Sequence, residues 1–342
     1  MVGKYELLYL NQEDLISAGL MDYNSSLKEV EKALVWHASK KSLSDKIALE
    51  LDPITDWKVN SLAAIDGNYA ANKWLGSNLT NKDMNLPRSI AIITLNDKRS
   101  GKPLCVMDGT LISAVRTGTY AGIGLKYLAN ERNNLGIIGS GVMAKSAYIS
   151  IMQTFPERIQ DVFLYSRNPE NAHSFARDMG RRSNKEINVV YSIGDLVNNS
   201  DVTVSATTKN NDSKIRLESV KKGYTHIHIG GWGISEEVIV DVAKNGKIIC
   251  DDWDLIKKRN AHPLPFAYNK NLIQNNDIHA NIGEIIVGDK PGRTNQGENI
   301  HFDTVGIAEM DLVLAIALYE KSCEKGMGQK IELWKEPHWL LK

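Results

Sequence analysis

The sequence lacks the features that mark secreted, disulfide-bonded and membrane proteins. Its 342 residues contain three widely separated cysteines, Cys105, Cys250 and Cys323, which excludes a disulfide framework and a Cys-x-x-Cys metal site. No apolar run reaches the roughly 18 residues of a membrane-spanning helix. The N-terminal segment also lacks the apolar core of a signal peptide. We therefore expect a soluble, cytoplasmic protein without a metal site.

An excess of charge of one sign is absent as well. The chain has 41 basic and 41 acidic residues, and no basic block stands out. Nucleic acid and anionic membrane surfaces are therefore not expected partners. The length is sufficient for two domains with a substantial core.

The centre of the sequence holds a strand–turn–helix pattern. An apolar run over residues 135–138 is followed by Gly-Ser-Gly-Val-Met-Ala, residues 139–144. Gly139 permits the tight turn, Gly141 lets the backbone approach a pyrophosphate, and Ala144 lets the helix pack on the strand. The N-terminus of the helix offers N–H groups to phosphate oxygens. The candidate dinucleotide contacts of this motif are Gly139, Ser140, Gly141, Val142 and Met143.

From residue 135 onward, short apolar segments alternate with helical patterns. This alternation predicts a Rossmann fold, a doubly wound parallel sheet of the α/β class. The expected strands are residues 135–138, 161–165, 188–191, 202–205, 225–229 and 247–250.

The segment before the glycine motif has a different pattern. Strand-like pieces between residues 46 and 107 are separated by turns, which predicts an antiparallel α+β meander. A helix over residues 108–129 follows, and a last helix over about 307–325 is expected to return to the meander. We therefore predict one domain from residues 1–129 plus 308–342, interrupted by a Rossmann domain over residues 130–307. A cleft between these domains is the expected substrate site.

The end of the second Rossmann strand bears on the choice of cofactor. NAD-binding proteins usually place an acidic residue there, whereas this sequence has Ser166-Arg167-Asn168. A hydroxyl followed by a guanidinium suits a 2′-phosphate, because arginine can grip it with two charge-assisted hydrogen bonds. These three residues therefore predict NADP(H), with NAD(H) still possible. The alternative is that Arg167 is only a solvated loop residue.

Four motifs lie in order along nearly the whole chain: Asn72-Lys-Trp74, Ile112-Ser-Ala-Val-Arg-Thr117, Gly139-Ser-Gly141 and Phe302-Asp-Thr-Val-Gly306 followed by Asp311. Together they resemble the ornithine cyclodeaminase/μ-crystallin family of NAD(P)-dependent enzymes. Further matches are Lys73-Trp-Leu-Gly-Ser77, Cys250-Asp-Asp-Trp253 and Val287-Gly-Asp-Lys-Pro-Gly-Arg293. With these the chain most resembles, within the family, the branch of N-(2-amino-2-carboxyethyl)-L-glutamate dehydrogenases of siderophore pathways. The resemblance implies oxidation of a secondary amine to 2,3-diaminopropionate and 2-oxoglutarate by a homodimer whose meander sheets pair.

The resemblance also implies site residues. Lys73 and Arg116 are expected in the substrate cleft. Lys73 would bind the substrate carboxylate or move a proton, and Arg116 would bind a substrate carboxylate or a cofactor phosphate. Lys46 and Arg88 are candidates for the second carboxylate of a glutamate-derived substrate, and both should point into the cleft if the substrate is a dicarboxylate. Further expected cofactor contacts are Arg116, Thr117, Thr207, Gly230 and Gly306.

Two departures from the family pattern argue against ornithine cyclodeaminase activity. Cyclodeaminases carry an aspartate after the Gly-Gly of a late Rossmann strand, where this chain has Trp232, and a glutamate in the meander, where it has Asn60. Trp232 is expected to line the substrate site as an apolar lid or to fill the core. An NADPH-dependent ketimine reductase and a non-catalytic NADPH-binding protein remain alternatives.

Other polar residues have simpler interpretations. His226 and His228 alternate along an expected buried strand, and a third nearby ligand would be needed for a metal. Glu309 and Asp311 are expected to cap or pair at the start of the last helix.

Overall fold

A computed structural model describes residues 4–52, 54–208, 214–231, 233–258 and 263–336. The chain divides into two compact units. The first comprises Met1–Asp22, Ser39–Arg116 and Ile307–Lys342, and the second comprises Tyr23–Ala38 and Thr117–Gly306. Relative to the predicted domain boundaries, the helix over Tyr23–Ala38 groups with the second unit, and the first boundary falls after Arg116 instead of after residue 129.

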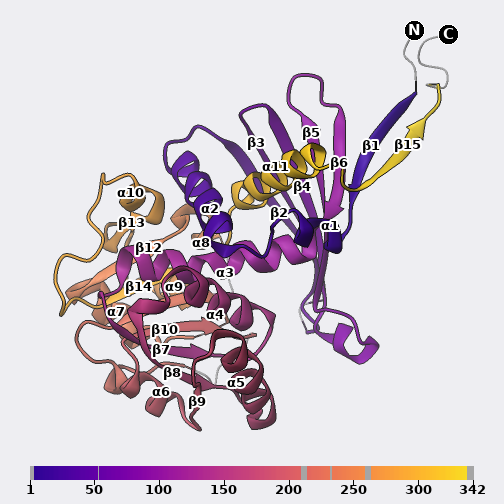
Figure 1. Cartoon of the computed structure of the whole chain (residues 1–342). Helices are drawn as coiled ribbons and strands as arrows, with labels where there is room; N and C mark the ends of the chain where they lie inside the picture. Colours follow the sequence, from indigo (N-terminus) through magenta and orange to yellow (C-terminus); the bar gives the residue numbers. More distant parts are fainter. Residues whose placement is uncertain (1–3, 53, 209–213, 232, 259–262, 337–342) are drawn as a thin grey trace. The chain divides into compact units, whose positions relative to one another are not determined.

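The first unit is built on a seven-stranded sheet (Figure 1). Strands β2 to β6 follow one another as an antiparallel meander, as the turn-separated pattern predicted. β1 pairs in parallel with β6, and β15 pairs antiparallel with β1, so both chain ends contribute to the sheet. In spatial order the strands are β15 (Gln329–Trp334), β1 (Tyr5–Leu10), β6 (Pro103–Asp108), β5 (Ser89–Asp97), β4 (Tyr69–Ser77), β3 (Trp57–Asp66) and β2 (Leu43–Asp52).

The two faces of this sheet differ. Helix α11 (Ala308–Glu324) packs against β3, β4 and β5 on one face, where Ile93 and Leu95 are buried. Alternate residues of the same strands point to the opposite face. There Trp74 and Ile92 are directly paired across β4 and β5 and are about half exposed. The short helices of this unit are α1 (Gln12–Ser17), which is capped by Asn11, and the 3₁₀ helix η1 (Leu79–Met84).

The second unit contains an eight-stranded sheet in which every pair of neighbouring strands is parallel. The predicted Rossmann fold class is therefore confirmed. In spatial order the strands are β13 (Ile278–Asn281), β12 (Lys247–Cys250), β14 (Ile300–Asp303), β11 (Thr225–Gly230), β10 (Val202–Ala206), β7 (Asn133–Ile138), β8 (Ile159–Tyr165) and β9 (Asn188–Val189).

Helices connect these strands. α3 (Gly109–Leu128) starts in the first unit and ends in the second, close to the predicted helix over residues 108–129. The others are α2 (Tyr23–Ala38), α4 (Val142–Thr154), η2 (Pro156–Arg158), α5 (Pro169–Ser183), α6 (Ile193–Asn199), η3 (Leu217–Ser219), α7 (Glu236–Asn245), α8 (Trp253–Lys257), α9 (Pro263–Asn269), η4 (Asn275–Asp277) and α10 (Ile282–Ile286). Within the described residues, none of these helices is long and apolar enough to cross a membrane.

Two strands of the second sheet, β13 and β14, were not predicted. β14 reads Ile-His-Phe-Asp and lies between β11 and β12, fully buried. Its His301 and Asp303 interrupt the apolar run that normally identifies a buried strand. The sequence pattern therefore resembles a loop where the fold has a central strand.

We predict that Gly118→Ala destabilises the second unit. Gly118 lies in α3, and an added Cβ would come within 2.6 Å of the carbonyl carbon of Ser146 in α4. Because backbone cannot move aside cheaply, we expect a loss of about 1–3 kcal/mol in the free energy of unfolding, measured by urea denaturation.

Gly194→Ala is the matched control. It lies in α6, and a Cβ there would make only ordinary contacts, at 3.6 Å or more. The control should leave stability unchanged or raise it by less than about 1 kcal/mol. Equal effects of the two variants would contradict the packing explanation.

Candidate active site

The glycine motif forms a tight turn between β7 and α4. Gly139 has a φ of +117°, and a Cβ there would collide with the carbonyl oxygen of Ala206. Gly141 is the N-cap of α4, uses no side chain to cap the helix, and faces open space where a Cβ would point. The free end of a 13-residue helix therefore faces a space that can admit an anionic group.

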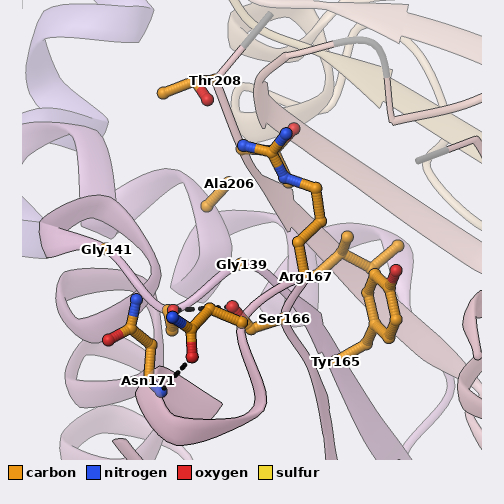
Figure 2. A pocket seen from close by; sticks show the side chains of 12 residues that line it. Gly139, Gly141, Tyr165, Ser166, Arg167, Asn171, Ala206 and Thr208 are labelled. Atoms are coloured by element: carbon orange, nitrogen blue, oxygen red, sulfur yellow. Dashed lines mark hydrogen bonds between the residues drawn. The ribbon is translucent and has the colours of Figure 1, made fainter. Parts of the chain in front are cut away.

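A cavity of about 400 Å³ opens beside this turn (Figure 2). The end of β8 contributes Tyr165, Ser166 and Arg167 to it, and the Ser166 and Ser140 hydroxyls are 2.9 Å apart. The motif residues and the end of β8 thus lie around one cavity, as the strand–turn–helix pattern predicted. The full lining is Ile138, Gly139, Ser140, Gly141, Tyr165, Ser166, Arg167, Asn168, Asn171, Ala206, Thr207 and Thr208.

Charge in this cavity comes from Arg167. Its side chain is exposed, and no residue in the described part of the chain forms a hydrogen bond or ion pair with its guanidinium. Asn168, in contrast, is used locally, because its side-chain oxygen accepts the amides of Glu170 and Asn171 and caps α5. The cavity lining contains no Asp or Glu. An arginine with no protein partner suits a phosphate group of a dinucleotide.

The other predicted cofactor residues have different positions. Thr207 lines the cavity, and its amide donates to the carbonyl of Gly230, 3.2 Å away. Gly306 has a φ of +79° and donates its amide to the buried carboxylate of Asp251 at 2.7 Å. Val142 is in the first turn of α4 and is exposed. Neither Gly230 nor Gly306 lines the cavity.

A second polar cluster lies entirely within the first unit. The Nζ of Lys73, on β4, is 2.6 Å from a carboxylate oxygen of Asp311 and donates to the hydroxyl of Ser113 at 3.2 Å. Arg116 lies one turn after Ser113 in α3, and its Nε is 3.5 Å from the other Asp311 oxygen. All of these side chains are buried. Among Lys73, Arg116 and Asp311, two cations therefore share one carboxylate.

This environment changes the proton affinity of Lys73. Burial, with a smaller contribution from Arg116, lowers the pKa of Lys73 to about 8, although Asp311 acts in the opposite direction. An ammonium with this pKa can give and take a proton near neutral pH. The cluster can therefore bind an anion and transfer a proton.

The structure separates the two residues expected to bind a second carboxylate. Lys46 pairs across the sheet with Leu62, which pairs with Lys73, so both lysines are on one face about 10 Å apart. Arg88 forms an ion pair with Asp56 and is 42% exposed. Trp232 lies outside the described residues.

Sequence reasoning expected Asp311 to cap or pair at the last helix, but it did not identify Lys73 as the partner. Asp311 and Glu309 do lie in the first turn of α11, as expected for acidic residues at a helix N-terminus. However, Asp311 pairs with Lys73, and Glu309 accepts a hydrogen bond from Ser42 at 2.8 Å. The available signal was the position of Asp311 next to the Phe302–Gly306 motif.

Comparison with known proteins identifies the family. The model of the Ornithine cyclodeaminase/mu-crystallin family matches residues 11–326. The chain belongs to this family. The prediction made from the Lys73, Arg116 and Gly139–Gly141 motifs is confirmed.

Three relatives are similar over nearly the whole chain. N-((2S)-2-amino-2-carboxyethyl)-L-glutamate dehydrogenase of Staphylococcus aureus is 28% identical over 96% of this chain and 99% of its own. A Thermococcus litoralis Delta(1)-pyrroline-2-carboxylate reductase, solved with NADH and L-proline, has a TM-score of 0.85 and 27% identity over 95% of this chain and all of its own. An archaeal alanine dehydrogenase, solved as a dimer with NAD, has a TM-score of 0.85 and 29% identity over 96% and 100%. These relatives are NAD(P)-dependent oxidoreductases of amine or imine groups, the class that the sequence predicted.

We predict that Asp311→Asn weakens both the fold and the proton affinity of Lys73. The change leaves two buried cations without their carboxylate, which should cost about 3–5 kcal/mol in the free energy of unfolding. Because Asp311 raises the pKa of Lys73, its removal should bring that pKa below about 8. Urea denaturation at several pH values measures both effects.

The control is Asp178→Asn, which breaks the exposed pair with Arg177. An exposed pair contributes little, so we expect a loss below about 1 kcal/mol and an unchanged pH dependence. Comparable losses in the two variants would contradict the importance of the buried cluster.

Proposed function

We propose that the protein oxidises the C–N bond of an amino-acid-derived secondary amine, with N-(2-amino-2-carboxyethyl)-L-glutamate as its substrate and NADP⁺ as its preferred oxidant. Bound NADP⁺ would supply the acceptor for a hydride from the carbon next to nitrogen, and the nitrogen would lose a proton. Water then adds to the resulting imine carbon, and cleavage of the C–N bond releases 2,3-diaminopropionate and 2-oxoglutarate. The 28% identical Staphylococcus aureus dehydrogenase supports this substrate class.

The observation that carries the proposal is the buried cluster of Lys73, Arg116 and Asp311. Two buried cations meet there at the carboxylate of Asp311, an arrangement suited to a further anion such as an amino-acid carboxylate. Arg116 binds this carboxylate, because its planar guanidinium can form two parallel hydrogen bonds with it. Lys73 moves the proton at the substrate nitrogen, because its pKa of about 8 lies near neutral pH.

The preference for NADP(H) rests on Arg167 and Ser166 at the end of β8. The exposed guanidinium has no partner among the described residues, and no carboxylate lines the cavity to repel a 2′-phosphate. The solved relatives carry NADH or NAD, so the proposed preference for NADP(H) rests on residues of this chain alone.

The sheet of the first unit supports a homodimer. Five large apolar side chains lie on the face away from α11, and each is between 45% and 58% exposed. Pairing this face with a second copy would remove it from water. The archaeal alanine dehydrogenase is also a dimer. The residues are Ile47, Leu49, Trp74, Ile90 and Ile92.

A second candidate function is reduction of a small cyclic ketimine by NADPH. The position of Arg88 favours it, because Arg88 pairs with Asp56 and leaves Lys46 as the remaining candidate for a second carboxylate. In this direction protonated Lys73 would donate to the imine nitrogen. The 27% identical Delta(1)-pyrroline-2-carboxylate reductase from Thermococcus litoralis supports this second candidate function.

The deciding measurement is turnover of N-(2-amino-2-carboxyethyl)-L-glutamate with NADP⁺ and with NAD⁺, in which reduced cofactor and 2-oxoglutarate are both quantified. We expect equal amounts of the two products. Absence of 2-oxoglutarate, together with NADPH oxidation by a cyclic ketimine, would assign the second function. If neither reaction occurs although NADPH binds, the result would favour a non-catalytic NADPH-binding protein.

We predict that Arg167→Ala reduces selectivity for NADP⁺. Loss of a charge-assisted contact to the 2′-phosphate should raise the KM for NADP⁺ by about 10–100-fold. The KM for NAD⁺ should change less than about threefold, because NAD⁺ lacks that phosphate. Arg177→Ala, on the exposed side of α5, is the control. Equal effects on both cofactors would contradict this role of Arg167.

A further inference from the structure

Four ionisable side chains are buried in the middle of the second sheet. His226 and His228 lie on β11, and their direct neighbours on β14 are His301 and Asp303. All four have an exposed fraction of 1% or less. The Nδ1 atoms of His226 and His301 are 3.0 Å apart, and the Nε2 of His226 is 2.7 Å from the hydroxyl of Ser205. This group lies in the second unit, whereas the proposed substrate cluster lies in the first. Of its residues, only His226 and His228 were expected on a buried strand.

The contacts of His228 determine its protonation. Its Nε2 is 2.8 Å from the carbonyl oxygen of Gly231, which can only accept a hydrogen bond, so Nε2 carries a proton. Its Nδ1 is 2.8 Å from a carboxylate oxygen of Asp303, which when ionised also only accepts. Both ring nitrogens therefore donate, and His228 is an imidazolium paired with the Asp303 carboxylate.

The bond to Gly231 controls a turn next to the cofactor cavity. Gly231 has a φ of +87°, and a Cβ there would collide with the side chain of Thr207. Thr207 lines the cavity and donates its amide to the carbonyl of Gly230. The turn that His228 holds is thus in direct contact with a cavity residue.

We propose that His228, as an imidazolium held by Asp303, is a positioning residue that fixes the Gly230–Gly231 turn against Thr207 and so keeps the cavity in the form that binds the dinucleotide. The inference rests on the proposed dinucleotide-binding function and adds to it a residue outside the cavity lining. The Thr304 hydroxyl donates to the carbonyl of His228, 2.8 Å away, so the backbone before the turn is held as well.

The proposal predicts how dinucleotide binding depends on pH. Burial lowers the pKa of His228, but the charge and hydrogen bond of Asp303, with Gly231 and Asp251, outweigh burial and raise it above its usual value. The neighbouring His226 remains neutral, because burial and the two other histidines lower its pKa well below its usual value. The other titratable neighbours of Asp303 are His301, 3.6 Å away, and Cys250, its direct neighbour on β12, whose pKa burial raises well above its usual value.

The direction of the pH effect on the turn depends on which of its two ring protons His228 loses. The carboxylate of Asp303 retains the proton on Nδ1, so deprotonation occurs at Nε2 and places a lone pair against the Gly231 carbonyl. The turn is therefore held below the raised pKa of His228, and it is released as the pH rises through that value. Affinity for NADPH should decrease over the same range.

Two double variants isolate the contact to Gly231. In H228Q/D303N the amide nitrogen of glutamine reaches the place of Nε2 and donates to Gly231, whereas in H228N/D303N the shorter amide reaches only the place of Nδ1. Both variants also carry Asp303→Asn, because the Asp303 carboxylate would otherwise be buried without the positive charge of His228. The variants differ by one methylene group and by the bond to the turn.

The measurement is the dissociation constant for NADPH from pH 6 to 9, with the melting temperature recorded in parallel. We expect H228N/D303N to bind about tenfold more weakly than H228Q/D303N, the effect of one lost hydrogen bond. H228Q/D303N should also lose the decrease in affinity that wild-type protein shows as the pH rises. Equal affinity and the same pH dependence in both variants would overturn the proposal.

A further readout separates this inference from the proposed function. If wild-type protein binds neither NADPH nor NADH, the proposed function fails. Amide hydrogen exchange at Gly230 and Gly231 then still tests the role of His228, and it should be faster in H228N/D303N than in H228Q/D303N. Equal exchange would show that His228 does not hold the turn.

Discussion

The ion pair between Lys73 and Asp311 is the constraint on which the first unit depends. A buried ammonium is costly unless a carboxylate accompanies it, and that carboxylate comes from more than 230 positions later in the chain. Helix α11 must therefore return to β4 after the Rossmann strands are complete. The cluster needs residues from the early and the late part of the chain. The meander domain is therefore interrupted in the sequence by the Rossmann sheet.

The sequence predicted those features of the fold that depend on residues close together in the chain. The turn at Gly139 requires a positive φ that glycine adopts readily, so residues 135–144 identified β7, α4 and the cavity beside them. The ion pairs were less accessible, because a partner depends on strand register and on distant segments. Arg88 and Lys46 looked equivalent in sequence, whereas Arg88 pairs with Asp56 and Lys46 shares a face with Lys73.

The strand β14 was missed for a physical reason that also explains its use. Apolar periodicity identifies buried strands because most buried residues are apolar. His301 and Asp303 break that rule, and they are acceptable only because each has a hydrogen-bonding or ionic partner on or next to β11. Polar residues that remain in a sheet core at this cost are a signal of function, and the same residues hid the strand from the apolar pattern.

The two buried clusters illustrate opposite uses of charge. In the first unit, the cations of Lys73 and Arg116 meet at the carboxylate of Asp311, and we propose that this cluster binds the carboxylate of a substrate. In the second unit, His228 and Asp303 balance one another, and a balanced pair has no need of a ligand. The Nε2 atom of His228 donates a hydrogen bond to the Gly231 carbonyl. A balanced pair can therefore fix backbone geometry without competing for the bound dinucleotide, which is what a positioning residue requires.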